Sequence, residues 1–234
     1  RDFRRYRGLG DVYKRQVLGC IIVYRIGTHI PIPGIDPVRV SSLFDQNQGT
    51  ILELFNLFSG GALERMSIFA LNVVPYISAA IIMQLFSNAI PYLIELKKEG
   101  QAGRNAITQY TRYGTVALAF VQASALAVTL SSSGLAYNPG TSFFVTAVFT
   151  VVAGTVFLMW LGEQISERGI GNGISIIIAT SILTGIPGAI GQALEQARQG
   201  DLNILMLLSI GVLAMVVIAI VVFIERGQRR ITVN

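Results

Sequence analysis

Few residues in this sequence could take part in catalysis or metal binding. It has one histidine, His29, and one cysteine, Cys20, whereas a metal site or a proton relay needs several titratable side chains within reach of one another. Glu163 and Glu167 are four residues apart beside Arg168, a pattern more typical of a solvated helix face than of an acid–base pair. We therefore expect a structural role for His29, and no enzyme activity, no metal site and no cofactor.

A glycine run is the next candidate, because glycine-rich turns bind phosphates in many nucleotide-binding proteins. Gly169, Gly171 and Gly173 have the spacing G-x-G-x-G, which is not the G-x-G-x-x-G of dinucleotide sites, and no strand pattern precedes them. The run favours instead a tight turn into an apolar helix, with a second helix approaching closely.

Three polar residues, Asn72, Ser78 and Gln84, lie in or beside an otherwise uncharged stretch. Taken alone, such side chains more often form hydrogen bonds between apolar helices than bind a substrate.

The elements that must position these residues are apolar. Of the 234 residues, 52% are hydrophobic and only 13% are charged, about half the charged fraction of a soluble domain. Too few polar side chains exist to cover a water-exposed surface, which predicts an integral membrane protein. The net charge is +5, but residues 1–16 contribute +4 of it. The basic charge therefore does not indicate nucleic-acid binding.

Residues 1–16 look foreign to the rest of the chain. The run 11–16 (DVYKRQ) resembles a translated DNA-library adapter, and an apolar stretch begins at Val17. We expect residues 1–16 to be a non-native leader and residues 17–234 to form the membrane domain. The alternative is a genuine basic amphipathic leader.

Apolar segments of about 20 residues are long enough to cross a bilayer as helices. Four stretches of 23 to 50 residues contain no charged residue or histidine; one is divided by turn-forming residues, and a short sixth segment contains Arg25. The predicted spans are about 17–30, 66–90, 113–130, 142–162, 172–192 and 202–224. The first could instead be an interfacial helix.

Basic residues in the short loops set the orientation. Outside the leader, one side carries eight of them and the other side three, which predicts a cytoplasmic N-terminus. The eight are Lys97, Lys98, Arg104, Arg112, Arg168, Arg226, Arg229 and Arg230.

The connection at 31–65 contains a shorter apolar run at 49–58. A helix of about ten residues spans about 15 Å and cannot cross a bilayer. Ser59, Gly60 and Gly61 follow it, and we expect a second helix to start near Leu63. The pattern predicts a re-entrant half-helix at about 50–63. The alternative is an amphipathic helix on the outer surface.

The second predicted span contains Pro75, which we expect to kink the helix. Val73 and Ile77 flank it four residues apart and so share a helix face. Ile174 and Ile178 form a second pair with the same spacing.

From residue 17 to 234 the chain resembles the SecY family, the large subunits of protein-conducting channels. The stretches that carry the resemblance are RIGTHIPIPGID (25–36), FSGGAL (58–63), PYISA (75–79), KKEG (97–100), QYTRYG (109–114), WLGEQI (160–165), ERGIGNGIS (167–175) and ERGQRR (225–230). Residues 1–16 do not resemble the usual leader of the family.

The resemblance implies an all-α, polytopic membrane bundle. The family fold has ten spans in two inverted halves. This chain would hold the N-terminal half plus one further span, with a re-entrant plug half-helix, and four C-terminal spans would be missing.

The resemblance also assigns site residues. The pore ring would include Val73, Ile77, Ile174 and Ile178, and the lateral gate Ser78 and Gln84. The plug would comprise Phe55, Asn56, Leu57, Phe58, Ser59, Gly60, Gly61, Ala62 and Leu63, moving on a hinge at Gly60 and Gly61. The cytoplasmic partner surface would comprise Lys97, Lys98, Arg104, Arg112, Arg226, Arg229 and Arg230.

The implied function is to pass unfolded polypeptides across, and laterally into, the cytoplasmic membrane of a bacterium. A ring of branched aliphatic side chains would resist ion leak by dewetting and still let any chain pass, because apolar contact is not directional. The implied partners are the small subunits SecE and SecG, the ATPase SecA, the ribosome, signal sequences and unfolded preproteins, and lipid. The alternatives are a secondary transporter of small solutes and a purely structural membrane subunit.

Overall fold

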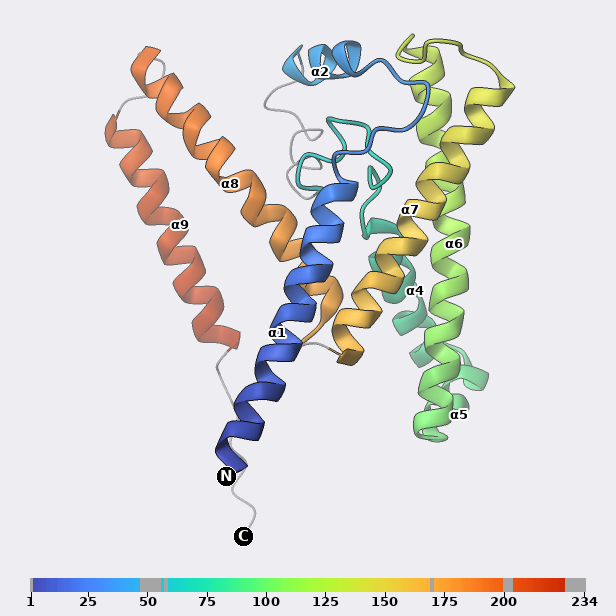
Figure 1. Ribbon diagram of the computed structural model, residues 1–234. Coiled ribbons are helices and arrows are strands. Elements are labelled where there is room, and N and C mark those ends of the chain that lie inside the picture. The colour runs from blue at the N-terminus through green and yellow to red at the C-terminus, as the bar shows by residue number, and fades with distance from the viewer. Residues whose placement is uncertain (1, 47–55, 57–58, 169–170, 200–203, 226–234) are drawn as a thin grey trace. The chain divides into compact units, whose positions relative to one another are not determined.

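The computed structural model describes residues 2–46, 56, 59–168, 171–199 and 204–225. Those residues form helices joined by turns, with no strand among them beyond two isolated bridges, Pro31 to Ser67 and Ile35 to Ala136. The helices in Figure 1 are α1 (Asp2–Gly27), α2 (Pro37–Gln46), α4 (Val74–Ala89), α5 (Pro91–Lys98), α6 (Gln101–Ser132), α7 (Thr141–Arg168), α8 (Gly173–Gln199) and α9 (Ile204–Glu225). The expected all-α fold class is confirmed.

The chain divides into two compact units, Arg1–Gly185 and Ile186–Asn234. The first contains α1 to α7 and the beginning of α8. The second contains the end of α8, which includes Pro187, and α9. Along α9, residues 211–225 are all exposed and almost all apolar. All the packing described below lies within the first unit.

Helix α1 runs without a break from Asp2 to Gly27. The helix therefore includes most of the leader expected to be foreign and does not begin at Val17. It ends where the Thr28 hydroxyl donates to the carbonyl of Arg25 at 2.7 Å, a local bond that competes with helix continuation. Whether residues 1–16 are native stays a prediction.

Helix α2 lies in the connection at 31–65, where the sequence had predicted a helix only from about residue 50. The Asp36 carboxylate accepts from the backbone N–H of Val38 at 3.0 Å and of Arg39 at 3.4 Å, and Pro37 stands at the first helical position. An acidic N-cap followed by proline is a strong helix start.

Helix α4 begins at Val74, so the expected helix start near Leu63 is wrong. Residues 60–73 form turns instead. Four of them have positive φ: Gly60 and Gly61 (65° and 80°), Met66 (42°) and Asn72 (48°). A right-handed helix cannot continue through left-handed residues.

The expected kink at Pro75 is also wrong. Pro75 lies in the first turn of α4, where the missing N–H would have had no partner within the helix. The sharp change of direction comes later, because α4 and α5 meet at 94° around Ile90.

Helix α6 packs through a stripe of small residues spaced four apart. Thr111, Thr115, Ala119, Ala123 and Ala127 are all buried, whereas their neighbours Phe120 and Val121 are exposed. Residues four apart lie on one helix face, and small side chains let helix backbones approach closely. This face lies against α4 and α7 (Figure 1).

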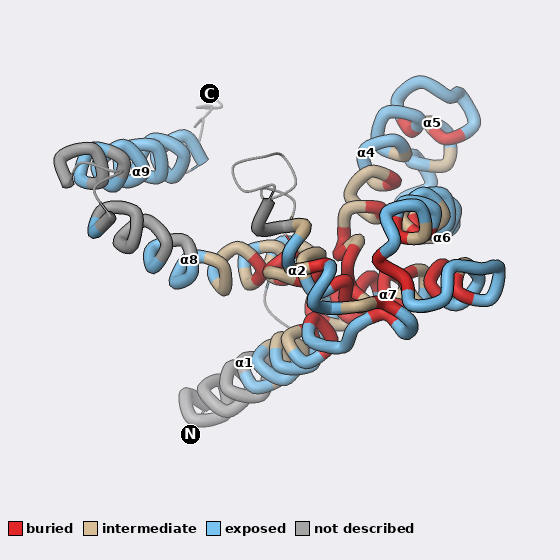
Figure 2. Tube along the Cα trace, turned by 90° about the horizontal axis from the view of Figure 1, so that it is seen from above, coloured by how far each residue is buried: buried red, intermediate tan, exposed pale blue. Residues whose placement is uncertain are grey.

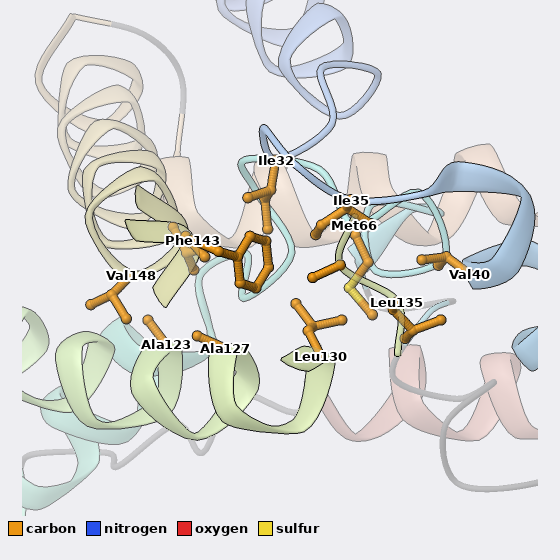
Figure 3. Close-up of a cluster of buried hydrophobic side chains, with 13 residues drawn as sticks. Ile32, Ile35, Val40, Met66, Ala123, Ala127, Leu130, Leu135, Phe143 and Val148 are labelled. Atoms are coloured by element: carbon orange, nitrogen blue, oxygen red, sulfur yellow. The ribbon is translucent and has the colours of Figure 1, made fainter. Parts of the chain in front are cut away.

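The largest apolar cluster lies at one end of α6 and α7 and is closed by the turns that precede α2 and α7 (Figure 3). Ile32 and Met66 come from the turns around α1 and α4, and Phe143 and Val148 come from α7. Figure 2 shows buried and exposed positions alternating along α7, and the same alternation occurs in α6, as expected for helices packed on one side.

A second feature is a series of stacked aromatic rings that leads from α1 across to α7. Tyr24 stacks on Phe69 and Phe69 on Phe157, each pair with ring centroids 6.0 Å apart, and Phe157 is 5.8 Å from Trp160. Tyr24 is buried and Trp160 is half exposed. Gly27 makes this arrangement possible, because a Cβ there would lie 2.0 Å from the Phe69 ring.

By length and composition, α6 and α7 could each cross a membrane, and the bent pair α4–α5 raises the number to three if it counts as one span. This count covers the described residues only. The apolar helices indicate a membrane protein, and the six span limits stay a prediction.

Candidate functional site

The four residues expected to form the pore ring meet in one apolar cluster. Val73 is buried in it, and Ile77, Ile174 and Ile178 pack against it partly buried. Val73 lies directly before α4 and Ile77 in its first turn, while Ile174 and Ile178 lie in the first two turns of α8. Two pairs about 100 residues apart in sequence are thus brought together. Their shared cluster also contains Tyr24, Ala62, Phe69, Leu158, Leu161, Ile165 and Ile177.

Close backbone contact between α7 and α8 positions Ile174. A Cβ on Gly162 would lie 2.4 Å from Cδ1 of Ile174, and a Cβ on Gly173 would lie 1.9 Å from the carbonyl oxygen of Gly162. At Gly173 the neighbour is backbone and only glycine fits, whereas a side chain at Gly162 would displace the movable end of the Ile174 side chain. Gly171 has a φ of 79° in the turn before α8. The structure thus shows the turn and close approach expected of this run at Gly171 and Gly173, while Gly169 lies outside the described residues.

Asn172 caps α8. Its Oδ1 accepts from the backbone N–H of Ile174 at 3.0 Å and of Ser175 at 3.4 Å, and the hydroxyl of Ser166 accepts from the Gly173 N–H at 2.8 Å. These bonds satisfy N–H groups that have no partner within the helix and fix where the ring-bearing face of α8 begins.

Of the expected plug, the structure describes Asn56 and Ser59 as helical and Gly60 to Leu63 as turns. Within the plug, Phe55, Leu57 and Phe58 lie outside the described residues. The Ser59 hydroxyl donates to the Asn56 carbonyl at 2.9 Å and accepts from the Leu63 N–H at 3.1 Å. Gly60, Gly61, Ala62 and Leu63 form turns. The half-helix at 50–63 therefore stays a prediction, apart from this end.

The turn is tied to α1 and packed on α8. Nη1 of Arg25 donates to the Gly60 carbonyl at 3.0 Å, and the Tyr24 hydroxyl lies 3.2 Å from the carbonyl oxygen of Ser59. A Cβ on Gly60 would meet the Cα of Ser181 at 3.2 Å. The proposed hinge is thus held on two sides.

Beside the ring lies a buried polar cluster that sequence reasoning missed. The Tyr24 hydroxyl hydrogen-bonds the Ser181 hydroxyl, and Nδ2 of Asn72 donates to the same Ser181 oxygen at 3.4 Å. Ser181 in turn donates to the carbonyl of Ile177 at 2.9 Å. All three side chains are 3% exposed or less. Asn72 had been noted as polar within an apolar stretch, and Ser181 carries the same signal.

His29 has partners that indicate a structural role. Its Nε2 lies 3.3 Å from Nη1 of Arg65, and its Nδ1 lies 2.8 Å from the Arg25 carbonyl oxygen. Because arginine only donates, Nε2 is the acceptor and Nδ1 carries the proton that the carbonyl accepts. In the part of the chain that the structure describes, no group of His, Cys, Asp or Glu is placed to hold a metal ion.

The two expected gate residues are not brought together. Ser78 is half-buried near the start of α4, whereas Gln84 lines a cavity of about 420 Å³ between α4, α5 and α6. Lys97 and Arg104 line the same cavity. The other residues around it are Tyr76, Ala80, Met83, Ser87, Ile107, Thr108 and Thr111.

Of the expected partner surface, Lys97, Lys98 and Arg104 are exposed. Arg112 differs, because its Nε forms an ion pair with Oε1 of Glu163 at 2.7 Å, which joins α6 to α7. Glu163 is therefore more than a solvated surface residue. Arg226, Arg229 and Arg230 lie outside the described residues.

Comparison with known proteins identifies the family. The family model described as SecY matches residues 67–234. The chain belongs to the SecY family.

The SecY-family protein "Protein translocase subunit SecY" of Pseudomonas aeruginosa is 60% identical over 229 residues, which are 97% of this chain and 52% of that relative. The subunit of the same name from Escherichia coli K12 is 56% identical over 240 residues, covering 100% of this chain and 54% of the relative. The chain thus spans about half the length of these two SecY relatives.

Two solved structures share the SecY-type fold. They are "Sec61 in the Canine ribosome-channel complex from the endoplasmic reticulum" and "The structure of a protein conducting channel", each with a TM-score of 0.65 and 20% identity. This chain aligns over 94% and 92% of its length and covers 48% and 47% of those chains. The expected family and fold are confirmed, and the comparisons do not support a small-solute transporter.

Proposed function

We propose that this chain supplies the N-terminal part of a protein-conducting channel in the cytoplasmic membrane of a bacterium. The observation that carries the proposal is that Val73, Ile77, Ile174 and Ile178, matched to the family's pore ring by sequence, meet in one apolar cluster. Three of the four are only partly buried, so each keeps a surface that can face a passing chain. The channel needs no reaction of its own.

The proposed ring works by excluding water. Branched aliphatic side chains offer no ligand for an ion, and a narrow apolar constriction disfavours a continuous column of water. The same surface yields to an unfolded polypeptide of any sequence, because apolar contact has no directional requirement. The turn at 59–63 packs beside the ring and would form the base of the plug. Ser78 and Gln84 on α4 would contribute to the gate toward lipid.

The basic residues would face the cytoplasm, with the N-terminus on the same side. Lys97, Lys98 and Arg104 are exposed, and they would contact SecA or a translating ribosome, as the family resemblance implies. SecE and SecG would complete the channel. The substrates would be signal sequences and unfolded preproteins.

The proposal is tested with a chimera in which this chain replaces the aligned half of the Escherichia coli relative, assembled with that organism's other translocase subunits in lipid vesicles. We expect the chimera to take up a secretory preprotein when SecA and ATP are added. Failure of uptake by a correctly assembled chimera would overturn the proposed function.

Replacing Val73, Ile77, Ile174 and Ile178 together by glycine tests the ring. We expect the resting leak of chloride from chimera vesicles to rise at least tenfold, because the constriction becomes wide enough to hold water. The matched control replaces four exposed apolar residues of α6 and α7, namely Val116, Val121, Val128 and Val145, by alanine. An unchanged leak in the ring variant would indicate a purely structural cluster.

A further inference from the structure

Apolar contact alone does not define one closed arrangement of the proposed ring. Its residues come from two separate elements, the start of α4 and the start of α8, and branched aliphatic surfaces slide over one another at little cost. Hydrogen bonds are directional and fix one geometry. A closed ring therefore needs polar contacts that join these elements.

The buried cluster at Ser181 makes such contacts. Asn72 precedes ring residue Val73 directly, and Ser181 lies one turn beyond ring residue Ile178 on α8. The Ser181 hydroxyl hydrogen-bonds the Tyr24 hydroxyl and accepts from Nδ2 of Asn72. The two hydroxyl protons of Tyr24 and Ser181 are shared among this pair and the nearby carbonyls of Ser59 and Ile177. One hydroxyl on α8 is thus hydrogen-bonded both to the segment before α4 and to α1.

Burial makes these bonds matter. Tyr24, Asn72 and Ser181 are 1%, 3% and 0% exposed, and a buried polar group that loses its partner is costly until water replaces it. Asn72 also has a φ of 48°, a conformation that asparagine tolerates better than most residues. The backbone is thus turned so that the amide reaches α8.

We propose that Tyr24, Asn72 and Ser181 form a hydrogen-bonded clasp that holds the two sides of the pore ring together in the resting channel. The three are positioning residues and do not touch the translocating chain. The clasp opens when the elements separate far enough for water to replace its bonds. This inference rests on the proposed function.

The test is the resting chloride leak of the chimera, measured without preprotein or ATP. Tyr24→Phe removes the hydroxyl and keeps the ring stacked on Phe69, and Ser181→Ala removes the partner that Tyr24 and Asn72 share. We expect Tyr24→Phe to raise the leak about fivefold, the effect of one buried hydrogen bond of ordinary strength on a two-state equilibrium. Ser181→Ala should raise it at least as much, because it also removes the bond to Asn72. The rate of preprotein uptake should not fall.

A double variant separates a shared clasp from two independent defects. Tyr24→Phe with Ser181→Ala should leak about as much as the larger single variant, because both remove the same bond. Asn72→Gly tests the third member, since glycine accepts the positive φ without strain. Thr180→Ala is the matched control: its hydroxyl bonds to the Ile176 carbonyl of its own helix, and we expect an unchanged leak.

The outcomes distinguish the clasp from the channel itself. Variants that translocate normally and leak no more than the unsubstituted chimera would overturn the clasp and leave the proposed function intact. Leaks that multiply in the double variant would also overturn it. Reduced uptake together with lowered thermal stability would show a general packing defect instead, again against the clasp. Failure of the unsubstituted chimera to translocate would refute the proposed function first.

Discussion

Gly162 and Gly173 set how closely α7 approaches α8, and through that approach they set the place of Ile174. Any side chain on Gly173 meets backbone rather than a movable side chain, because the Gly162 carbonyl oxygen lies 1.9 Å from the position of its Cβ. Backbone yields less easily than a side chain, so the two helices would have to separate. The ring therefore depends on residues that have no side chain.

We predict that Gly173→Ala destabilises the chimera by about 1–3 kcal/mol, the usual cost of overpacking a close contact. The measurement is thermal unfolding in detergent. Gly211→Ala in α9 is the control, because nothing lies within 4 Å of its Cβ position and alanine favours a helix over glycine. Equal melting temperatures for the Gly173 variant and the unsubstituted chimera would contradict the prediction.

At the residue level, the sequence predicted what depends on local spacing. The pairs Val73 with Ile77 and Ile174 with Ile178 follow from the period of a helix, and the family resemblance assigned both to one ring. The contact of Tyr24 with Ser181 could not be predicted, because 157 residues separate them. No periodic pattern encodes such a distant pair.

At the level of elements, the small-residue stripe of α6 decides how this helix packs. The stripe is buried against α4 and α7, and a longer side chain in it would push whole helices apart. Its threonine hydroxyls bond within α6: Thr115 donates to the Thr111 carbonyl at 2.8 Å. The stripe's threonine protons are therefore used within α6 and are not available to a neighbouring helix. The close packing of this face depends mainly on the small size of its side chains.

We predict that Ala123→Leu lowers the stability of the chimera by about 1–3 kcal/mol. Ala123 is 1% exposed, whereas Val121, two residues away on the other face, is 65% exposed. Val121→Leu is the matched control and should change stability by less than about 0.5 kcal/mol. Equal unfolding of the two variants would mean that the α6 face is not closely packed in the membrane.

The errors at this scale have local causes. The helix expected to start near Leu63 and to include the span 66–90 begins only at Val74, because Met66 and Asn72 have positive φ. Neither residue type predicts that conformation as strongly as glycine does. Pro75 was assigned to a helix interior only because the helix was expected to start too early. In contrast, α6 and α7 each contain one of the expected apolar segments, 113–130 and 142–162, although both helices are longer than those segments.

At the scale of the whole molecule, the two ends of the proposed channel differ in how their basic side chains are engaged. Lys97 and Arg104 lie at the bend between α5 and α6, away from the turn at 59–63, where Arg25 and Arg65 are engaged with backbone and His29. Exposed basic residues on one face attract an acidic partner surface over roughly 10 Å at moderate salt. The proposed docking should therefore depend on ionic strength.

We predict that Lys97→Glu with Arg104→Glu weakens SecA binding to chimera vesicles about tenfold at low salt, and that the difference shrinks in high salt. Binding is measured by sedimentation with the vesicles. Arg39→Glu is the control, because Arg39 lies near the loop between α6 and α7, where it donates to the Gly134 carbonyl at 2.9 Å. Loss of binding that persists unchanged at high salt would point to damaged folding rather than lost attraction.

The aromatic series from Tyr24 to Trp160 gives this molecule an optical property. Trp160 is the only tryptophan in the sequence, so its emission comes from a single place, and three ring-to-ring steps of about 6 Å lead from it to Tyr24. Light absorbed by the tyrosine can pass to the indole by energy transfer, and its yield changes when the rings separate. Because the sequence has eight tyrosines, the difference between the native chain and Tyr24→Phe isolates the part of this transfer that reports movement between α1 and α7, without an attached dye.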